Sequence, residues 1–395
     1  SIQFDPAYSA LLSCRIMRLC LPGLASALVV HVRYPSETLG SHKMFLRGSA
    51  CGLSWDQGQA MTPVGADTYE LALPSCGSGE HVELKPVVDD VTWAQGANSE
   101  VDVGAQGEVA EVFPWFFTGK GTVKVLKDVK SPQGLATRDV AVYLPPSFEE
   151  NTLKAYSNVL IAHDGNNLFD QVQCDTCCAN GCWGVDTTLD TYIAASNPGL
   201  MSEVVVVGVY NTPDRMDELT YSKDPKYGGG KLDTYLTFVE KTVMPLVAKE
   251  FPRVSAASAG PWPMMGSSLG GLATCYAGWT QGSKYSPVAC MSSSFWWDGE
   301  DFKGSILAKS GPSPKQDHPF YIDWGSGEVS EQTDSNAAVV KQLQGMGWEQ
   351  EVAYYIQPDG THNEQSWGAR VNKPLQLLFP PAPIATKTPQ TSIFV

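Results

Sequence analysis

From Thr122 onward, short apolar runs alternate with longer segments in which apolar residues recur at helical spacing. The runs at residues 158–162, 203–209 and 319–324 are of the kind that parallel sheets bury on both faces. Between them, helical faces are predicted within residues 232–246 and 337–343, the second closed by Gly345. Strands that alternate with helices in this way predict an α/β domain, with helices layered on a central sheet.

Before Val112 the pattern changes to short alternating runs separated by turn residues. These runs cover residues 27–34, 43–47, 68–73 and 81–88. Alternation with a period of two residues, interrupted by turns, is typical of a small antiparallel β-sandwich. We therefore divide the chain into a β-sandwich domain at 1–112, a linker at 113–121, an α/β domain at 122–379 and a C-terminal surface tail at 380–395.

Composition and charge narrow the class of protein and its partners. Of 395 residues, 43% are hydrophobic and 17% are charged, which excludes a disordered chain and a long coiled coil. The formal net charge of -15 disfavours nucleic acid and anionic membrane surfaces as partners. The apolar stretch from Leu19 to Val32 contains Pro22 and Gly23, and we interpret it as a buried strand rather than a signal peptide or membrane span.

The chain contains 10 cysteines, which favours secretion or another oxidising compartment. Four of them form a cluster at Cys174, Cys177, Cys178 and Cys182. The adjacent pair in this cluster cannot easily point at one tetrahedral centre, so we expect disulfides there rather than a zinc site. Cys51 and Cys76 are expected to form a further disulfide.

The segment Gly266-Ser-Ser268-Leu-Gly270 has the Gly-x-Ser-x-Gly pattern of a nucleophile elbow. In an elbow, a sharp turn between a strand and a helix lifts the serine hydroxyl above the sheet. Glycines two positions before and after are needed because side chains there would collide across the turn. Residues 263–265 can supply the strand and residues 269–279 the helix, so Ser268 is the predicted nucleophile.

A serine nucleophile needs a base, which in this fold follows the serine and the acid along the chain. Only His318 and His362 follow Ser268. His318 directly precedes a predicted strand, which places it at the wrong end of the sheet. His362 follows the predicted strand 351–357, at the edge where active sites of open α/β sheets gather. We therefore predict His362 as the base.

The acid that orients the histidine is expected after the preceding strand. Glu328 lies in a glycine-rich turn just past residues 319–324, and its carboxylate is the favoured partner of His362. Asp334 is the alternative, and Asp323 is a weaker one because it lies inside the strand.

An oxyanion hole needs two backbone N–H groups aimed at the developing negative charge. Leu269, at the start of the helix after the nucleophile, supplies one of them. The second is expected from Gly165 or Asn166, in the loop after the strand at 158–162.

These residues resemble a known family of α/β-hydrolases that includes feruloyl, acetyl-xylan and enterobactin esterases, S-formylglutathione hydrolases and mycolyltransferases. The resemblance covers roughly Arg138 to Pro374. Its motifs are Val142-Tyr-Leu-Pro-Pro146, His163-Asp-Gly-Asn-Asn-Leu-Phe-Asp170, Asp214-Arg-Met-Asp-Glu-Leu-Thr-Tyr221, Met265-Gly-Ser-Ser-Leu-Gly-Gly-Leu272, Ser294-Phe-Trp-Trp297 and the Glu328 and His362 segments. It implies an α/β-hydrolase fold, the triad Ser268, Glu328 and His362, and substrate contacts from Arg215, Tyr221 and Trp296 or Trp297.

The first domain is similar to starch-binding carbohydrate-binding modules of families 20 and 48. The similarity rests on Met44-Phe-Leu-Arg-Gly-Ser49, Leu53-Ser-Trp-Asp56, Glu83-Leu-Lys85 and Val91-Thr-Trp-Ala-Gln-Gly-Ala-Asn98. It implies that Trp55 and Trp93 stack on sugar rings while Lys85 and Asn98 bind hydroxyl groups. The alternative is a purely structural domain whose tryptophans lie in the core.

The sequence therefore predicts a serine esterase that acts on a small-molecule or carbohydrate ester and requires no metal or other cofactor. Two alternatives remain open, namely an acyltransferase with the same triad and a non-catalytic glucan-binding protein. The family resemblance does not fix the acyl group or the alcohol.

Overall fold

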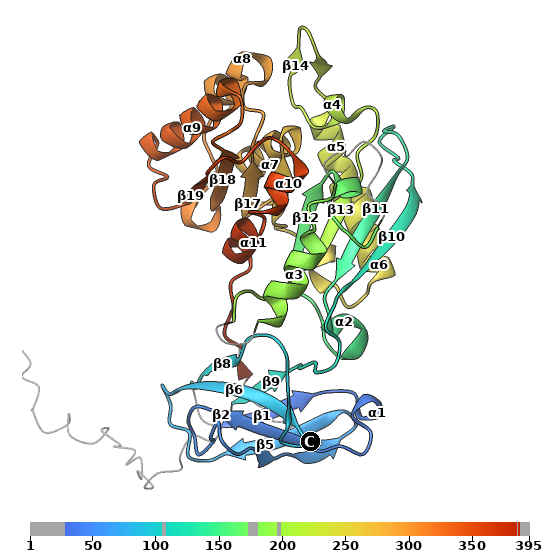
Figure 1. The fold of residues 1–395 in the computed structure, drawn as a ribbon, viewed down its shortest axis with the longest axis vertical. Coiled ribbons are helices and arrows are strands. Elements are labelled where there is room, and N and C mark those ends of the chain that lie inside the picture. The colour runs from blue at the N-terminus through green and yellow to red at the C-terminus, as the bar shows by residue number, and fades with distance from the viewer. Residues whose placement is uncertain (1–27, 105–107, 173–180, 196–198, 385, 388–395) are drawn as a thin grey trace, which may run out of the picture.

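The structure, a computed structural model, describes residues 28–104, 108–172, 181–195, 199–384 and 386–387. Figure 1 shows a smaller β-domain built from the first part of the chain and a larger α/β domain above it. The predicted fold class, an α/β-hydrolase-like domain preceded by an all-β domain, is confirmed. Within the described ranges, no helix combines the length and the apolar character needed to cross a membrane.

The first domain packs two sheets around a single core. One sheet has the strand order β20-β9-β1-β5-β4, and the other has the order β3-β2-β6-β7, with β8 also paired to β6. Burial alternates along β1 and β2, as expected when one face of each strand meets the core and the other does not. The elements are β1 (Leu28–Arg33), α1 (Ser36–Leu39), β2 (Met44–Gly48), β3 (Gln59–Ala60), β4 (Thr62–Gly65), β5 (Thr68–Leu73), β6 (His81–Val88), β7 (Thr92–Trp93), β8 (Ser99–Asp102) and β9 (Val109–Val112).

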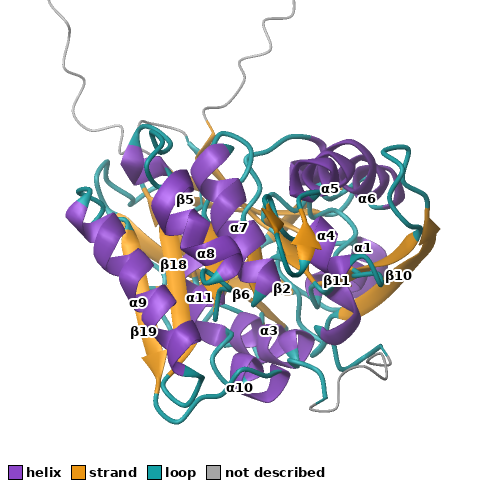
Figure 2. Cartoon of the chain, turned by 90° about the horizontal axis from the view of Figure 1, so that it is seen from above, coloured by secondary structure: helices purple, strands orange, loops and turns teal. Residues whose placement is uncertain are grey.

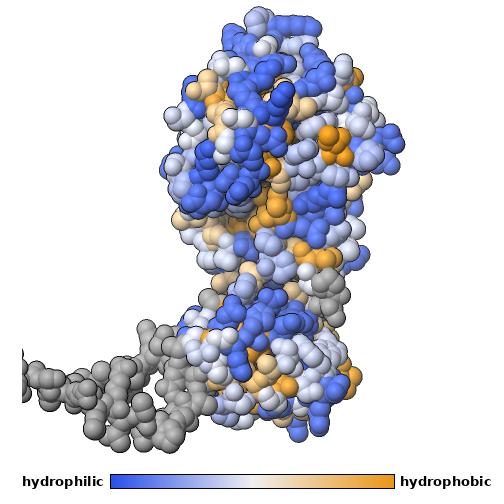
Figure 3. Space-filling view, turned by 90° about the vertical axis from the view of Figure 1, so that its left-hand side faces the viewer, coloured by the Kyte–Doolittle hydropathy of each residue, from blue (hydrophilic) through white to orange (hydrophobic). Residues whose placement is uncertain are grey.

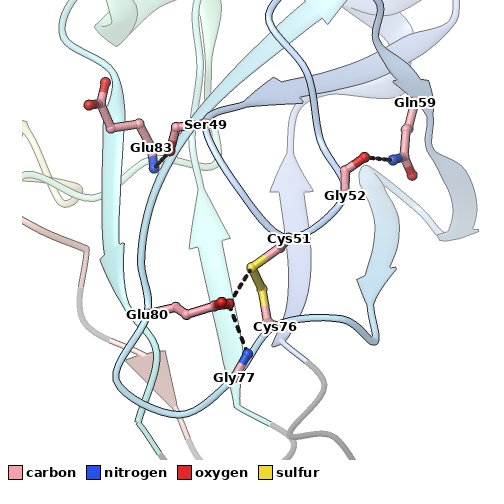
Figure 4. Close-up of a disulfide and its surroundings, with 8 residues drawn as sticks. All are labelled: Ser49, Cys51, Gly52, Gln59, Cys76, Gly77, Glu80 and Glu83. Atoms are coloured by element: carbon pink, nitrogen blue, oxygen red, sulfur yellow. Dashed lines mark hydrogen bonds between the residues drawn. A yellow bond between two sulfur atoms is a disulfide. The ribbon is translucent and has the colours of Figure 1, made fainter.

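A disulfide joins Cys51 and Cys76 in this domain, as the sequence predicted (Figure 4). The carboxylate of Glu80 lies beside it, and both sulfurs are committed to the disulfide rather than available to a metal ion. A second disulfide joins Cys275 to Cys290. These disulfides between described residues indicate an oxidising compartment. Of the predicted cysteine cluster, Cys174, Cys177 and Cys178 lie outside the described residues.

The second domain is built on an eight-stranded sheet of order β10-β11-β13-β12-β16-β17-β18-β19. The strands from β13 to β19 run parallel, and β10 and β11 are antiparallel. Every residue of β12, β13, β16, β17 and β18 is buried, because helices cover both faces. The strands are β10 (Thr122–Val129), β11 (Arg138–Leu144), β12 (Val159–His163), β13 (Val205–Val209), β16 (Met264–Ser267), β17 (Val288–Met291), β18 (Phe320–Gly325) and β19 (Val352–Gln357).

Helices cover both faces of this sheet (Figure 2). On one face, α5, α6, α7 and α9 bury their apolar side chains in the larger of two cores. On the other, α3 and α11 close a second core. A small hairpin of β14 (Lys223–Asp224) and β15 (Gly228–Gly229) follows α4. The helices are α2 (Ser147–Glu150), α3 (Val185–Ala194), α4 (Arg215–Glu218), α5 (Leu232–Phe238), α6 (Met244–Glu250), α7 (Leu269–Thr280), α8 (Trp297–Asp301), α9 (Ser330–Gly345), α10 (Glu364–Gly368) and α11 (Asn372–Leu378).

The carboxylate of Glu150, at the end of α2, ties the linker and the first domain to the second. Its Oε1 accepts hydrogen bonds from the Tyr34 hydroxyl at 2.8 Å and from the Phe116 N–H at 2.6 Å. Its Oε2 accepts from the N–H groups of Phe117 at 3.0 Å and Thr118 at 2.7 Å. A buried carboxylate is stable only when its lone pairs are satisfied, so these bonds help to hold the two domains together. Figure 3 shows that the molecule narrows between the two domains.

The chain returns to the first domain after α11. The Ile384 N–H donates to the Glu100 carbonyl at 2.7 Å, and Thr386–Lys387 forms β20, antiparallel to β9. We expected residues 380–395 to form a surface tail, but Ile384 and Thr386–Lys387 are bound to the first domain instead. The backbone groups of Thr386–Lys387 pair with the open edge of β9, and Ile384 packs on the core of the first domain.

Candidate active site

Ser268 occupies the turn between β16 and α7 with φ 57° and ψ -123°, a strained conformation for a residue with a side chain. A Cβ added to Gly266 would lie 2.6 Å from the backbone of Gly270, closer than any real contact. The steric reason for glycine, a collision across the turn, therefore holds at Gly266. The turn leaves Ser268 partly exposed, whereas Ser267 and Leu269 are buried.

The loop after β12 packs against this turn. A Cβ on Gly270 would lie 3.1 Å from Cβ of His163 and 3.3 Å from Oδ2 of Asp164. The next three residues, Gly165–Asn167, form a buried 3-10 turn. The two predicted sources of oxyanion donors, this loop and the start of α7, therefore lie side by side.

The backbone of the loop can approach this closely because residue 165 is glycine. A Cβ on Gly165 would lie 2.3 Å from the carbonyl carbon and oxygen of Gly208 in β13. On the other side of the site, Leu269 is the first residue of α7, and N–H groups in the first turn of a helix have no partner within the helix. These N–H groups can be directed at a ligand.

We expect Gly165→Ala to lower kcat/KM about 100-fold, the typical effect of losing one oxyanion donor. The added methyl group cannot fit against Gly208, so the loop has to move away from Ser268. Ester hydrolysis by the purified variant measures the effect. Gly345→Ala, where a Cβ meets nothing within 4 Å, is the matched control and should leave the rate unchanged.

The imidazole of His362 is held by Glu328. Its Nδ1 lies 2.9 Å from Oε2 of Glu328, whose side chain is buried, whereas the His362 side chain is 35% exposed. Burial alone would raise the pKa of Glu328. Hydrogen bonds from His362, Ser292 and the Gly325 N–H outweigh burial and hold its pKa below the ordinary value. An ionised Glu328 can only accept, so Nδ1 of His362 carries the proton and Nε2 can take one from a nucleophile.

The alternative acids are placed elsewhere. Asp334 is exposed on α9. Asp323 is fully buried, its Oδ1 bonded to Nε of Arg370 and its Oδ2 to the hydroxyl of Tyr321, both at 2.9 Å. Burial raises the pKa of Asp323 to about 6, an effect that Arg370 partly offsets. The geometry therefore favours Glu328.

The turn after β17 joins the two halves of the site. The Ser268 N–H donates to the Met291 carbonyl, and the Ser294 N–H donates to the Ser268 carbonyl, both at 3.0 Å. The Ser268 and Ser294 hydroxyl oxygens lie 3.3 Å apart. Among the described residues no hydrogen bond joins Ser268 to His362, a contact that often tightens only when substrate binds.

The geometry is that of a serine hydrolase of the α/β class, and residues 135–377 match the model of the family described as Putative esterase. The chain belongs to this family. The family resemblance predicted from the sequence is thereby confirmed. The matched residues begin after the first domain, so the resemblance of that domain to starch-binding modules stays a prediction.

One curated protein and two solved structures are similar to this chain. A stretch of 106 residues is 32% identical to the siderophore triacetylfusarinine C esterase of Aspergillus fumigatus, and it covers 26% of this chain and about a third (34%) of that relative. A siderophore hydrolase from Aspergillus nidulans aligns at 19% identity and TM-score 0.48, over 65% of this chain and 93% of that one. The enterobactin esterase of Shigella flexneri aligns at 14% identity and TM-score 0.48, over 88% of this chain and 90% of that one.

Arg215, an expected substrate contact, is bonded to Asp164 in the loop that is predicted to supply an oxyanion donor. Its Nε and Nη2 meet the two carboxylate oxygens of Asp164 at 2.6 and 2.8 Å, and Asn211 Nδ2 also donates to Asp164. Burial opposes ionisation of Asp164, but Arg215 and Asn211 hold its pKa below the ordinary value. Because Asp164 directly precedes Gly165, the Arg215 side chain steadies the loop, and its 30% exposure leaves part of it open to solvent.

The expected aromatic contacts separate into different environments. Trp297 has 0% exposure and donates its Nε1 proton to the Ser222 carbonyl, so it is a core residue and not a substrate contact. Trp296 is partly exposed and donates to Oε1 of Gln332. Tyr221 stacks on Tyr276, with ring centroids 4.6 Å apart.

The expected carbohydrate-binding residues of the first domain are divided in the same way. Trp55 and Trp93 are 36% and 40% exposed, with ring centroids 6.3 Å apart. Lys85 is buried and donates to the Gly96 carbonyl, and burial lowers its pKa to about 8. Asn98 donates to Glu83 at 2.8 Å. Lys85 and Asn98 line a cavity of about 340 Å³ between the domains, so Lys85 is not a surface partner of the tryptophans.

Sequence reasoning missed two buried residues behind Glu328. Ser292 donates to Oε1 of Glu328, and Arg370 donates to the Ser292 hydroxyl. Ser292 lies two residues before the Ser294-Phe-Trp-Trp297 motif, which was the available signal. Arg370 lies between two short helices, and no local pattern marks it.

Proposed function

We propose that the chain hydrolyses a carboxylic ester with Ser268 as nucleophile, His362 as general base and acid, and Glu328 as the residue that orients His362. The observations that carry the proposal are the hydrogen bond from Nδ1 of His362 to a buried, ionised Glu328 and the strained elbow that holds Ser268. That arrangement holds the imidazole in the tautomer that accepts a proton from serine.

The reaction follows from these placements. The Ser268 oxygen attacks the ester carbonyl while its proton moves to Nε2 of His362. The carbonyl oxygen becomes negative and is stabilised by N–H groups of Leu269 and of Gly165 or Asn166. The tetrahedral intermediate collapses, the alcohol leaves with the proton from His362, and the acyl group stays on Ser268. Water, deprotonated by His362, then releases the acid and restores the serine.

Labelling by a fluorophosphonate probe tests this proposal without knowledge of the substrate. We expect one equivalent of probe on Ser268, located by peptide mass analysis. A panel of esters then defines the substrate class, and because the matched relative acts on a siderophore, the panel includes a siderophore ester beside acetyl sugars and feruloyl esters. Product analysis with an added sugar alcohol separates hydrolysis from acyl transfer. No labelling of Ser268 would contradict the proposal.

For the first domain we propose glycan binding at the exposed pair Trp55 and Trp93. The guanidinium of Arg47 lies 4.7 Å from the Trp93 ring and its Nε bonds Asp90, which fixes that ring beside polar groups. Flat indole faces with polar neighbours suit the C–H faces of sugar rings.

We expect retardation on starch or binding of cyclodextrin by this protein, abolished in Trp55→Ala and in Trp93→Ala. Affinity electrophoresis measures the effect. Phe117→Ala, another exposed aromatic residue but in the linker, serves as the control and should bind as the parent does. If the parent and the tryptophan variants migrate equally in the presence of the glycan, the proposed glycan binding is wrong and the domain has a structural role.

A further inference from the structure

Ser292 sits in an unusual conformation directly beneath the candidate site. It lies in the turn after β17 with φ 41°, in the left-handed region that residues with side chains rarely adopt, and it is fully buried. Its N–H donates to the Asp323 carbonyl, and its own carbonyl accepts from Nε2 of Gln332, both at 2.6 Å. Strain that neighbouring groups hold in place in this way commonly marks a functional position.

The direction of each hydrogen bond at the Ser292 hydroxyl follows from its partners. Nη2 of Arg370 at 2.6 Å and Nε1 of Trp367 at 3.1 Å can only donate, so they occupy the two lone pairs of the hydroxyl oxygen. The remaining partner is Oε1 of Glu328, at 2.5 Å. The single hydroxyl proton therefore has to point at Glu328.

The same contacts decide which oxygen of Glu328 is left for His362. Oε1 accepts from Ser292 and from the Gly325 N–H at 2.8 Å. Oε2 is the oxygen that meets Nδ1 of His362. With Oε1 held from two directions, the carboxylate plane cannot rotate without breaking a buried hydrogen bond.

Arg370 adds a charge to this arrangement. It is buried, its Nε pairs with Asp323 at 2.9 Å, and Nη1 donates to Gln357 at 2.6 Å. Its Nη2 lies 3.8 Å from Oε1 of Glu328. One guanidinium thus stands between two buried carboxylates and favours the ionised form of Glu328.

We propose that Ser292, aligned by Arg370 and Trp367, is a positioning residue that directs the ionised Glu328 carboxylate at His362. The proposal rests on the proposed function, since it requires Ser268, His362 and Glu328 to act together. In this proposal Ser292 acts on His362 through Glu328. Ser292 belongs to the turn after β17, which also contacts Ser268.

Loss of the Ser292 hydroxyl has a predictable effect on proton binding. Among the described residues, the charged and titratable groups that face Glu328 are His362, Arg370 and Asp323. The hydrogen bond from Ser292 is one of the contacts that hold the pKa of Glu328 below its ordinary value, so its loss should raise the pKa of Glu328. The acidic limb of the rate profile should therefore move to higher pH.

The test compares Ser292→Ala, Ser292→Gly and Ser293→Ala with the parent enzyme in fluorophosphonate labelling of Ser268. Both Ser292 variants should lose about 10- to 100-fold in the maximal labelling rate, the loss expected for one hydrogen bond to a charged group, with little change in the probe concentration at half saturation. The acidic limb should rise in pH in both. Glycine accepts φ 41° without strain, so Ser292→Gly separates the lost hydroxyl from backbone effects.

Ser293→Ala is the matched control. Ser293 is equally buried and adjacent, and its Oγ has no hydrogen-bond partner among the described residues, so the parent rate is expected. Parent-like labelling rates and pH profiles in both Ser292 variants would overturn the positioning role. A loss of labelling rate in only one of them, the variant with the lower unfolding temperature, would overturn it as well. If the parent itself is not labelled at Ser268, the proposed function is the part that fails.

Discussion

Ser268→Ala is expected to abolish ester hydrolysis, with kcat lowered about 10⁵- to 10⁶-fold, the size of loss that removal of a serine nucleophile causes elsewhere. Without the hydroxyl oxygen no acyl-enzyme forms, and the residual rate comes from the oxyanion donors and substrate binding alone. The strained conformation at φ 57° is as accessible to alanine as to serine, so the fold should be retained. Steady-state kinetics and thermal unfolding of the same preparation measure both quantities.

The adjacent serine provides the control for this variant. Ser267 ends β16 and is buried, and it shares the glycine-flanked turn with Ser268. Ser267→Ala should therefore keep its fluorophosphonate labelling while Ser268→Ala loses it. Undiminished hydrolysis by Ser268→Ala would rule out the proposed mechanism and point to another nucleophile.

Glu328→Gln is expected to lower kcat about 10⁴-fold although the side chain keeps its shape, as in other triads whose acid becomes an amide. The Ser292 hydroxyl and the Gly325 N–H both donate toward Oε1, so the amide oxygen stays on that side. The amide NH₂ group then faces Nδ1 of His362 and needs an acceptor there. The imidazole proton moves to Nε2, where it blocks proton transfer from Ser268.

Asp334→Asn is the companion variant, because Asp334 was the other candidate acid. It is exposed on α9, and its charge should be dispensable, with kcat within about twofold of the parent. Initial rates on one activated ester compare the two variants directly. A large loss in Asp334→Asn with little loss in Glu328→Gln would exchange their roles.

Much of the α/β domain could be predicted because its strands and helices carry distinct periods. The runs at 158–162, 203–209 and 319–324 are β12, β13 and β18, each displaced by a residue or two. The helical face at 232–246 became the continuous helical segment from α5 to α6. The place of the chain's last described residues could not be predicted, because a two-residue edge strand depends on an open partner rather than on its own sequence.

In the candidate site, the sequence predicted the residues whose chemistry requires a local pattern. Gly266 and Gly270 frame the elbow, and chain order selects His362. It did not predict that Trp297 and Lys85 are buried, since whether a tryptophan or a lysine meets solvent depends on what packs over it. The role of Arg370 was not predicted for the same reason, because its hydrogen-bond partners come from β18, from β19 and from the turn after β17.

The first and the last described strands, β1 and β20, both lie in the first domain. The chain leaves that domain through the linker held by Glu150 and re-enters it beside β9, so two separate connections join the two domains. Because of these two connections, unfolding of one domain disturbs the other. We therefore expect the two domains to unfold in one cooperative transition rather than one after the other. A scanning calorimeter should then record a single endotherm, although the protein has two domains.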